Sequence, residues 1–369
     1  DATPATVIAV TGSDGKTTTT TLTHLLLSEA AKRRGGTAYV GGNIGTPLLS
    51  RVSEMKQCDF AVLELSSFQL MTMHGAARRA AITNITPNHL NWHTGMKEYT
   101  RAKYNVFGSG TELLVLNAKS PAAAAAADAD PDFHGAVTFF SAHTSSYDET
   151  VPEAHRGNAC AVFLRGDSIV FSDGRYEEEL LRREDIKLPG LHNVENYMTA
   201  AALTRGLAEK EDLRHIARTF GGVPHRIELV RELDGVKYYN SSIDSTPTRT
   251  EAALSVFDCR PVFILCGRDK HLPFDGLARA LYDRAGGVVV SGEAMPVIRA
   301  ALEAEAARRG GSTLPVVYED DFFAAVDRAR ELARPGSAVV LSPSCTSFDR
   351  FRNFEERGNA FREYVNRLK

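Results

Sequence analysis

Runs of apolar, β-branched residues alternate along this chain with segments in which apolar residues recur at helical spacing. The first run, Val7–Val10, leads through a glycine-containing turn into the helical pattern Thr18–Ala31. Strands that alternate with helices in this way are typical of a mostly parallel sheet covered by helices. Further strands are predicted at 37–40, 60–64, 80–86 and 113–117. The pattern therefore indicates an α/β fold.

The pattern changes after residue 120. The alanine-rich stretch Pro121–Asp130 predicts a surface helix or loop without chemistry. Short alternating runs follow at 136–140, 159–164 and 168–171, with a turn at Asp173-Gly174. We interpret these runs as a small antiparallel sheet that flanks the main one.

Glycine and proline at 221–224 interrupt the pattern and predict a hinge. We therefore expect two domains, residues 1–222 and residues 223–369. In the second domain, strands are predicted near 236–240, 262–266, 287–291, 315–318 and 338–342, and helices near 247–257, 274–284, 294–308, 321–333 and 354–367. This rhythm predicts a Rossmann-like α/β domain, although the absence of a G-x-G-x-x-G turn gives no indication of dinucleotide binding.

Composition excludes several classes of protein. The 369 residues include 43% hydrophobic and 24% charged residues, and the formal net charge of −3 gives no reason to expect nucleic-acid binding. The five cysteines form no C-x-x-C pair, which favours reduced thiols in a cytoplasmic protein over a zinc site. No apolar stretch is long enough to predict membrane insertion, and the N-terminus does not resemble a signal peptide. Because the first strand starts so early, we expect nothing folded before it in this chain.

The turn after the first strand has the composition of a phosphate-binding loop. It reads Gly12-Ser13-Asp14-Gly15-Lys16-Thr17 and opens a helix. Glycines let backbone N–H groups approach phosphate, the helix N-terminus adds positive potential, and lysine and threonine can reach phosphate and Mg²⁺. The usual P-loop has a further glycine six residues before the lysine, where this chain has Val10. A plain strand–turn–helix is the alternative.

Four polar residues near predicted strand ends are candidates for substrate or metal binding, because ligands gather at the carboxyl ends of parallel strands. Asn43 lies between glycines, Glu64 ends a buried strand, and His89 and His93 follow another. The alternatives are that Asn43 belongs to a plain turn, that Glu64 forms a structural ion pair, and that the two histidines are packing residues. Of the two histidines, His89 is nearer the strand end and is the better metal ligand.

Lys103 lies on the apolar stripe of the predicted helix that contains Met96, Tyr99, Val106 and Phe107. Such a lysine either extends its amine to water or is desolvated, which lowers its pKa. A neutral amine can react with CO₂ to form a carbamate. Near Glu64 and His89, that carbamate would complete a second Mg²⁺ site.

The second domain has polar residues after three of its strands, in the segments 240–250, 266–270 and 342–347. Together with arginines near residue 350, these hydroxyls, amides and cations can bind an anionic amino acid, whereas solvated loops are the alternative. In the first domain, Asn193 and Asn196 can offer amides to an adenine ring, and an N-cap role for Asn193 is the simpler explanation.

Taken in order, several short motifs resemble those of the Mur ligase family. They are Gly12–Thr17, Gly42–Gly45, Glu64–Leu70, Asn88–Leu90, Ala102-Lys103, His192-Asn193, Pro224–Arg226, Leu341–Pro343 and Asn353–Gly358. The Glu-Leu-Ser-Ser-Phe-Gln-Leu and Phe-Glu-Glu-Arg-Gly segments resemble those of the family's D-glutamate-adding members. The resemblance spans nearly the whole chain but includes no counterpart of the family's N-terminal UDP-binding domain.

The resemblance implies an ATP-dependent, cytoplasmic step of peptidoglycan synthesis that joins D-glutamate to UDP-N-acetylmuramoyl-L-alanine, with two Mg²⁺ ions and a monomeric enzyme. It implies catalytic roles for Lys16, Glu64, His89 and Lys103. ATP would be bound by Gly12, Ser13, Asp14, Gly15, Lys16, Thr17, Thr18, Asn193, Asn196 and Arg226. Metal would be bound by Thr17, Glu64, His89 and carbamylated Lys103. Substrate would be bound by Asn43, Ser66, Ser245, Lys270, Ser347 and Phe354.

This chain departs from the family pattern at Asn88, Asn91 and Ser241, where many members have aspartate, and near Ser245, where some have lysine. The alternative functions are another ligase of the superfamily, such as a folate polyglutamate ligase, an ATP-binding fragment without ligase activity, and a P-loop ATPase switch.

Overall fold

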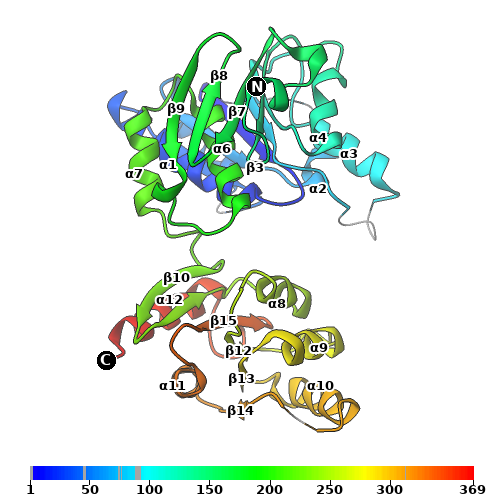
Figure 1. Ribbon diagram of the computed structural model, residues 1–369, viewed down its shortest axis with the longest axis vertical. Helices are drawn as coiled ribbons and strands as arrows, with labels where there is room; N and C mark the ends of the chain where they lie inside the picture. The colour runs from blue at the N-terminus through cyan, green and yellow to red at the C-terminus, as the bar shows by residue number, and fades with distance from the viewer. Residues whose placement is uncertain (1–2, 45–46, 74, 76, 88–92, 312) are drawn as a thin grey trace. The chain divides into compact units, whose positions relative to one another are not determined.

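The computed structural model describes residues 3–44, 47–73, 75, 77–87, 93–311 and 313–369. The chain forms two compact units, Asp1–Phe220 and Gly221–Lys369 (Figure 1). Each unit contains a mostly parallel sheet covered by helices, which confirms the predicted α/β fold. No helix in the described parts of the chain is long and apolar enough to cross a membrane.

The first unit contains one nine-stranded sheet in the order β2-β3-β1-β4-β5-β6-β7-β8-β9. Its strands are β1 Thr6–Thr11, β2 Ala38–Gly42, β3 Phe60–Glu64, β4 Arg79–Ile82, β5 Leu113–Asn117, β6 Ala136–Ser141, β7 Ala159–Arg165, β8 Ser168–Ser172 and β9 Glu177–Arg182. The strands from β2 to β7 pair in parallel, and only β8 and β9 pair antiparallel. The predicted separate antiparallel sheet is therefore wrong, because β6 extends the main sheet beside β5.

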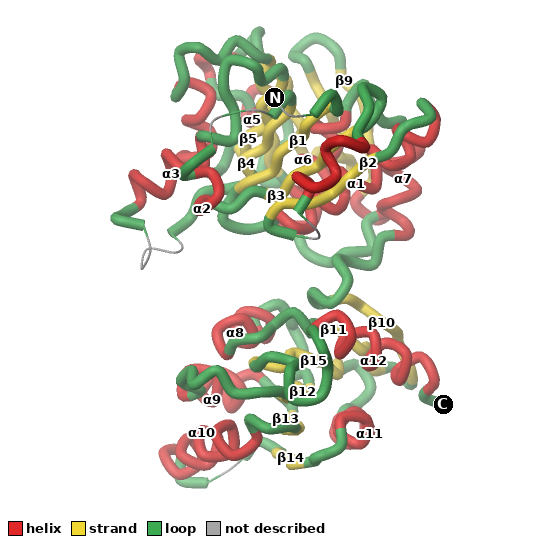
Figure 2. Tube along the Cα trace, turned by 180° about the vertical axis from the view of Figure 1, so that it is seen from behind, coloured by secondary structure: helices red, strands yellow, loops and turns green. Residues whose placement is uncertain are grey.

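Helices cover both faces of this sheet, which explains why its central strands are apolar at successive positions. Ile8 and Val10 pack with α1 Lys16–Arg33, α6 Leu191–Thr204 and α7 Lys210–Thr219, whereas Ala9 packs in the cluster on the opposite face (Figure 2). That face includes α3 Met96–Tyr104 and α4 Pro121–Ala124. The shorter helices are α2 Ser67–Leu70, α5 Tyr147–Thr150 and the 3₁₀ segments Leu48–Glu54, Ala125–Asp128, Glu153–His155 and Arg183–Asp185.

The second unit contains a six-stranded sheet in the order β10-β11-β15-β12-β13-β14. Its strands are β10 Glu228–Leu233, β11 Val236–Asn240, β12 Val262–Cys266, β13 Gly287–Ser291, β14 Val316–Tyr318 and β15 Ala338–Ser344. All pair in parallel except β10, an antiparallel edge strand that the sequence pattern did not predict. Helices α8 Pro247–Leu254, α9 Asp275–Arg284 and α10 Met295–Arg308 cover one face, and α11 Phe322–Leu332 and α12 Phe354–Arg367 cover the other.

Parallel pairing places the carboxyl ends of neighbouring strands at one edge of each sheet. In the first unit, β1, β3 and β4 are neighbours, so the segments that follow them share an edge. In the second unit, β11, β15 and β12 are neighbours. These two edges carry most of the candidate residues.

Candidate active site

The phosphate-type loop after β1 is fixed by two residues that follow β4. Asn84 accepts hydrogen bonds from Ser13 N through its carbonyl (2.9 Å) and its side chain (3.0 Å), and its side chain also accepts from Asp14 N (2.8 Å). Thr83 Oγ1 donates to Asp14 O (2.5 Å). These contacts explain why β4 ends at Ile82 rather than at the predicted residue 86, because the chain beyond it braces the loop. Sequence reasoning missed both residues.

The N-terminus of α1 faces this loop and has no side-chain cap among the described residues. Gly15 takes the N-cap position with φ 75°, a left-handed conformation that favours glycine. A Cβ atom there would lie 2.5 Å from Asn196 Oδ1. Lys16 Nζ donates to Gly12 O (3.0 Å) and Ser13 O (2.9 Å), so its ammonium lies within the loop. An uncapped helix N-terminus with a lysine beside it has the chemistry of a phosphate site.

The predicted phosphate-binding residues therefore lie together. Gly12, Ser13, Asp14 and Gly15 form the loop, and Lys16, Thr17 and Thr18 begin α1. Thr17 is buried and its carbonyl accepts a hydrogen bond from Thr21 Oγ1 (2.8 Å).

Two amides from α6 approach the same turn. Thr19 Oγ1 donates to Asn196 Oδ1 (3.1 Å), and Asn196 Nδ2 donates to Asn193 Oδ1 (3.1 Å). Gly190 is the N-cap of α6, so the alternative in which Asn193 caps this helix is wrong. Asn193 lies in the first turn instead, where its Nδ2 donates to Pro189 O (2.7 Å).

Glu64 ends β3 directly beside Val10 of β1 and Gly42 of β2. Its side chain is buried, with 1% exposure. Asn43 Nδ2 donates to Oε1 (2.8 Å), but Oε2 has no hydrogen-bond partner among the described residues. A buried carboxylate oxygen is costly without a partner, and a divalent cation is a ligand that would satisfy it.

The rest of the predicted metal site is tested only in part. No group of three or more His, Cys, Asp or Glu side chains gathers in the described part of the chain. His89, however, lies outside the described residues, as do Asn88 and Asn91. The described donors that suit Mg²⁺ are the carboxylate of Glu64 and the hydroxyl of Thr17, both oxygens.

Lys103 is buried on α3, with 1% exposure, so of the two alternatives for this lysine its amine is desolvated rather than extended to water. Its Nζ donates to Gly12 O (2.7 Å) and lies 4.5 Å from the centre of the Tyr99 ring. Burial, together with the nearby charge of Lys16, lowers the pKa of Lys103 to about 7. Two lysines thus converge on one carbonyl of the loop, and a large fraction of Lys103 is uncharged at neutral pH.

A small polar cluster, formed by residues of α2 and α3 and by His93 before α3, borders the loop. Tyr99 OH lies 3.0 Å from Ser13 Oγ, within hydrogen-bond distance. His93 is buried, its Nε2 lies 2.9 Å from Ser67 Oγ, and its ring stacks on Phe68. The sequence pattern favours His89 over His93 as a ligand and predicts Tyr99 only as part of an apolar face, so neither His93 nor Tyr99 is predicted beside the loop.

Ser66, a predicted substrate contact, is the N-cap of α2. Its side chain accepts from Gln69 N (3.3 Å), and Gln69 Oε1 accepts from the Ser66 amide and hydroxyl (both 2.9 Å). This capping box supports the turn after Glu64.

In the second unit, the structure brings two predicted substrate residues together, since Lys270 Nζ donates to Ser245 Oγ (3.3 Å). Ser347 is buried in the segment after β15, and Phe354 begins α12 with its ring against His225. Arg226 is exposed in the segment before β10.

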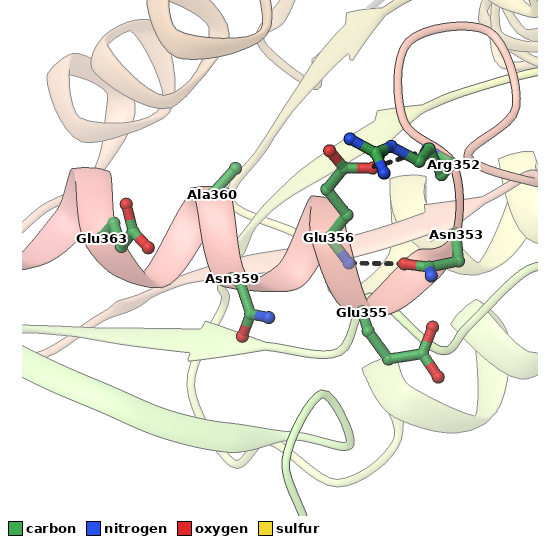
Figure 3. A pocket seen from close by; sticks show the side chains of 7 residues that line it. All are labelled: Arg352, Asn353, Glu355, Glu356, Asn359, Ala360 and Glu363. Atoms are coloured by element: carbon green, nitrogen blue, oxygen red, sulfur yellow. Dashed lines mark hydrogen bonds and ion pairs between the residues drawn. The ribbon is translucent and has the colours of Figure 1, made fainter.

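The second unit also has an open hollow along α12 (Figure 3). Its described lining is Arg352, Asn353, Glu355, Glu356, Asn359, Ala360 and Glu363. Asn353 Oδ1 caps the helix by accepting from Glu356 N (2.8 Å), and Arg352 N donates to Glu356 Oε2 (2.8 Å). None of the predicted substrate residues lines this hollow.

Two family descriptions match the chain. "Mur ligase middle domain" matches residues 10–204, and "Mur ligase, glutamate ligase domain" matches residues 225–345. The chain belongs to the Mur ligase family. Mur ligases form amide bonds with ATP and generally use Mg²⁺, so the chain is an ATP-dependent ligase.

Individual Mur ligases agree with this assignment. A relative from Acetivibrio thermocellus, named UDP-N-acetylmuramoylalanine--D-glutamate ligase, is 44% identical over 99% of this chain and 75% of its own length. A Clostridium novyi relative with the same name is 43% identical over the same shares. Among solved structures, MurF from Acinetobacter baumannii matches with a TM-score of 0.63 at 18% identity, covering 99% of this chain and 77% of that chain, which shows a shared fold.

Proposed function

We propose that this Mur ligase adds D-glutamate to UDP-N-acetylmuramoyl-L-alanine through an acyl phosphate, in peptidoglycan synthesis. The names of its relatives at more than 40% identity support the substrates. The structural observation that carries the proposal is the Lys16 ammonium, held by Gly12 O and Ser13 O beside the N-terminus of α1, which has no side-chain cap among the described residues. The positive potential of this ammonium and of the helix N-terminus suits a triphosphate.

The chemical problem is that a carboxylate is a poor electrophile. In the proposed reaction, a carboxylate oxygen of the L-alanyl group attacks the γ-phosphorus of ATP, the bond from that phosphorus to the β,γ-bridging oxygen breaks, ADP leaves, and an acyl phosphate forms. The amine of D-glutamate then attacks the acyl carbon, loses a proton, and phosphate leaves. Lys16 and the first turn of α1 stabilise the negative charge on the phosphates, and Asn193, Asn196 and Arg226 hold the remainder of ATP.

Glu64 and Thr17 would hold Mg²⁺, which supplies further charge neutralisation when bound. The unsatisfied Oε2 of Glu64 supports this assignment. We place a second ion at His89 and at a carbamate of Lys103. The carbamate forms when the neutral amine bonds to the carbon of CO₂ and releases a proton, and the lowered pKa of Lys103 supports it.

We assign recognition of D-glutamate to Lys270, Ser245, Ser347 and Phe354, and contacts with the acceptor to Asn43 and Ser66. The hydrogen bond between Lys270 and Ser245 supports a shared carboxylate subsite. Asn43 also orients Glu64, so its loss would affect the metal ligand as well. We further propose that the chain is a cytoplasmic monomer with domains 1–222 and 223–369. Its five free cysteines are consistent with a reducing compartment.

The test is phosphate release and product mass with ATP, Mg²⁺, D-glutamate and UDP-N-acetylmuramoyl-L-alanine. We expect release only when both substrates are present, and a product heavier by one glutamyl residue. L-glutamate and D-aspartate serve as controls for the amino acid. Product with a folate acceptor instead, or ATP binding with no release under any combination, would refute the proposal.

A further inference from the structure

The carboxyl edge of the second sheet contains a buried chain of polar groups that the proposed reaction does not use. Ser342 Oγ donates to Asp244 Oδ2 (2.9 Å) and lies 2.9 Å from Thr250 Oγ1, and Ser344 Oγ donates to Thr250 Oγ1 (2.9 Å). All four residues are at most 7% exposed. We call Asp244, Thr250, Ser342 and Ser344 the hydroxyl chain. Because β11 and β15 are neighbours, it links the segment after β11 to the end of β15.

We propose that Asp244 is a positioning residue of the amino-acid subsite. Through the hydroxyl chain, it fixes the segment that contains Ser245 relative to the segment that contains Ser347. This inference rests on the proposed function, because it assumes that Ser245 and Ser347 contact the incoming amino acid. Asp244 directly precedes Ser245, and the segment anchored by the hydroxyl chain at Ser342 and Ser344 leads to Ser347.

The backbone of Ser344 explains why β15 needs such an anchor. Ser344 has φ 63°, a left-handed conformation that is unfavourable for serine. Its N–H donates to Asp244 O (2.9 Å) and its hydroxyl belongs to the hydroxyl chain. The turn after Ser344 therefore depends on contacts with the segment after β11, and Ser347 lies three residues beyond it.

Asp244 sets the direction of the hydrogen bonds in this chain. A hydroxyl can donate or accept, whereas an ionised carboxylate only accepts. With Asp244 as acceptor, the one proton of the Ser342 hydroxyl is donated to Asp244, while Thr250 Oγ1 donates to the Ser342 backbone carbonyl (3.3 Å) and accepts from Ser344 Oγ. This arrangement of donors favours one conformation of the segment.

Burial raises the pKa of Asp244. Hydrogen bonds from Ser241 and Ser342, and the charges of Arg249 and Arg226, act in the opposite direction and favour the carboxylate as an acceptor. Asparagine can supply the same acceptor oxygen without a charge, whereas alanine cannot.

The experiment compares Asp244→Ala, Asp244→Asn and the exposed control Asp258→Ala in steady-state assays of the whole chain. We expect Asp244→Ala to raise the KM for D-glutamate about five- to tenfold, the cost of one lost buried hydrogen bond, while the KM for ATP changes less than about twofold. Asp244→Asn should restore most of the affinity for D-glutamate, and Asp258→Ala should resemble the parent. Hydrogen exchange of residues 341–347 should quicken in Asp244→Ala, with no change in residues 6–17.

Two outcomes overturn the inference. In the first, Asp244→Ala changes neither the KM for D-glutamate nor the rate of hydrogen exchange at residues 341–347. In the second, Asp244→Ala raises the KM for D-glutamate and the KM for ATP equally, which indicates general destabilisation. If Asp244→Ala does not fold, Thr250→Ala compared with Thr250→Ser provides the same test, since only serine keeps the hydroxyl. If the parent makes no product with D-glutamate, the proposed function fails, while the exchange measurement still decides whether Asp244 orders the segment.

Discussion

Replacing Lys103 with methionine should make the protein more stable at neutral pH while abolishing ligase activity. Methionine keeps a long, apolar side chain in the buried position on α3 but removes the amine. The amine is expensive to bury, because burial and the charge of Lys16 lower its pKa from 10.5 to about 7. That difference corresponds to about 5 kcal/mol of destabilisation of the charged form.

The dependence on pH follows from proton linkage. The pKa of Lys103 is lower in the folded state than in the unfolded state, so the unfolded chain binds more protons between about pH 7 and 10.5. The stability of the parent protein therefore rises with pH in this window. Relative to a side chain that does not titrate, Lys103 costs about 4 kcal/mol at pH 7 and about 2 kcal/mol at pH 9. The lost hydrogen bond to Gly12 O offsets about 1 kcal/mol at both pH values.

We therefore expect Lys103→Met to exceed the parent in free energy of unfolding by about 3 kcal/mol at pH 7 and about 1 kcal/mol at pH 9. Urea unfolding followed by circular dichroism measures both values, in buffer purged of CO₂ so that no carbamate forms. Lys97→Met, at an exposed position on the same helix, is the matched control. Parallel pH dependences for the parent and Lys103→Met would refute the reasoning, as would full ligase activity in the variant.

Three further variants test other parts of the site. Glu64→Gln should leave the folded protein at least as stable, because it replaces a buried carboxylate that has an unsatisfied oxygen with a neutral amide. The same change should lower kcat by about a hundredfold or more and raise the Mg²⁺ concentration needed for phosphate release. Gly15→Ala should raise the KM for ATP about tenfold or more, because the new Cβ atom would clash with Asn196. Gly35 has a similar φ of 68° but open space around it, so Gly35→Ala should lower the stability in thermal unfolding by only about 1 kcal/mol and leave the KM for ATP unchanged. Arg357→Lys should destabilise the second unit by about 2 kcal/mol in urea, because the buried guanidinium donates to Ser242 and Cys345 with a geometry that lysine cannot reproduce; an unchanged transition midpoint would count against this account.

Local sequence patterns were sufficient to predict most of the strands and helices that carry the phosphate-type loop of the first unit. The run Val7–Val10 is apolar at every position because β1 is covered on both faces, so its strand and the following helix could be predicted from the local pattern of apolar residues. The position of Lys103 on the apolar face of its helix could be predicted as well, because a helical stripe places a residue on a face without reference to distant parts of the chain, whereas the burial of its amine could not.

Contacts between distant segments could not be predicted in this way. Asn84 and Thr83 follow a short strand and have no periodicity, and their bonds to the loop 70 residues earlier arise only because β4 pairs with β1. The run at 136–140 has the same short alternation as the antiparallel strands after it, so nothing local shows that β6 pairs in parallel with β5. Strand pairing is decided by tertiary packing, which a single-strand pattern does not contain.

The two loop carbonyls that hold the Lys16 ammonium also affect which anions can bind to it. Any anion that recruits this ammonium must compensate for the carbonyl dipoles it gives up, and a monovalent ion such as chloride offers one charge for that exchange. A polyphosphate chain presents several charges and many acceptor oxygens at once. In the proposed ATP site, the loop's own backbone would therefore disfavour simple salt ions relative to a nucleotide.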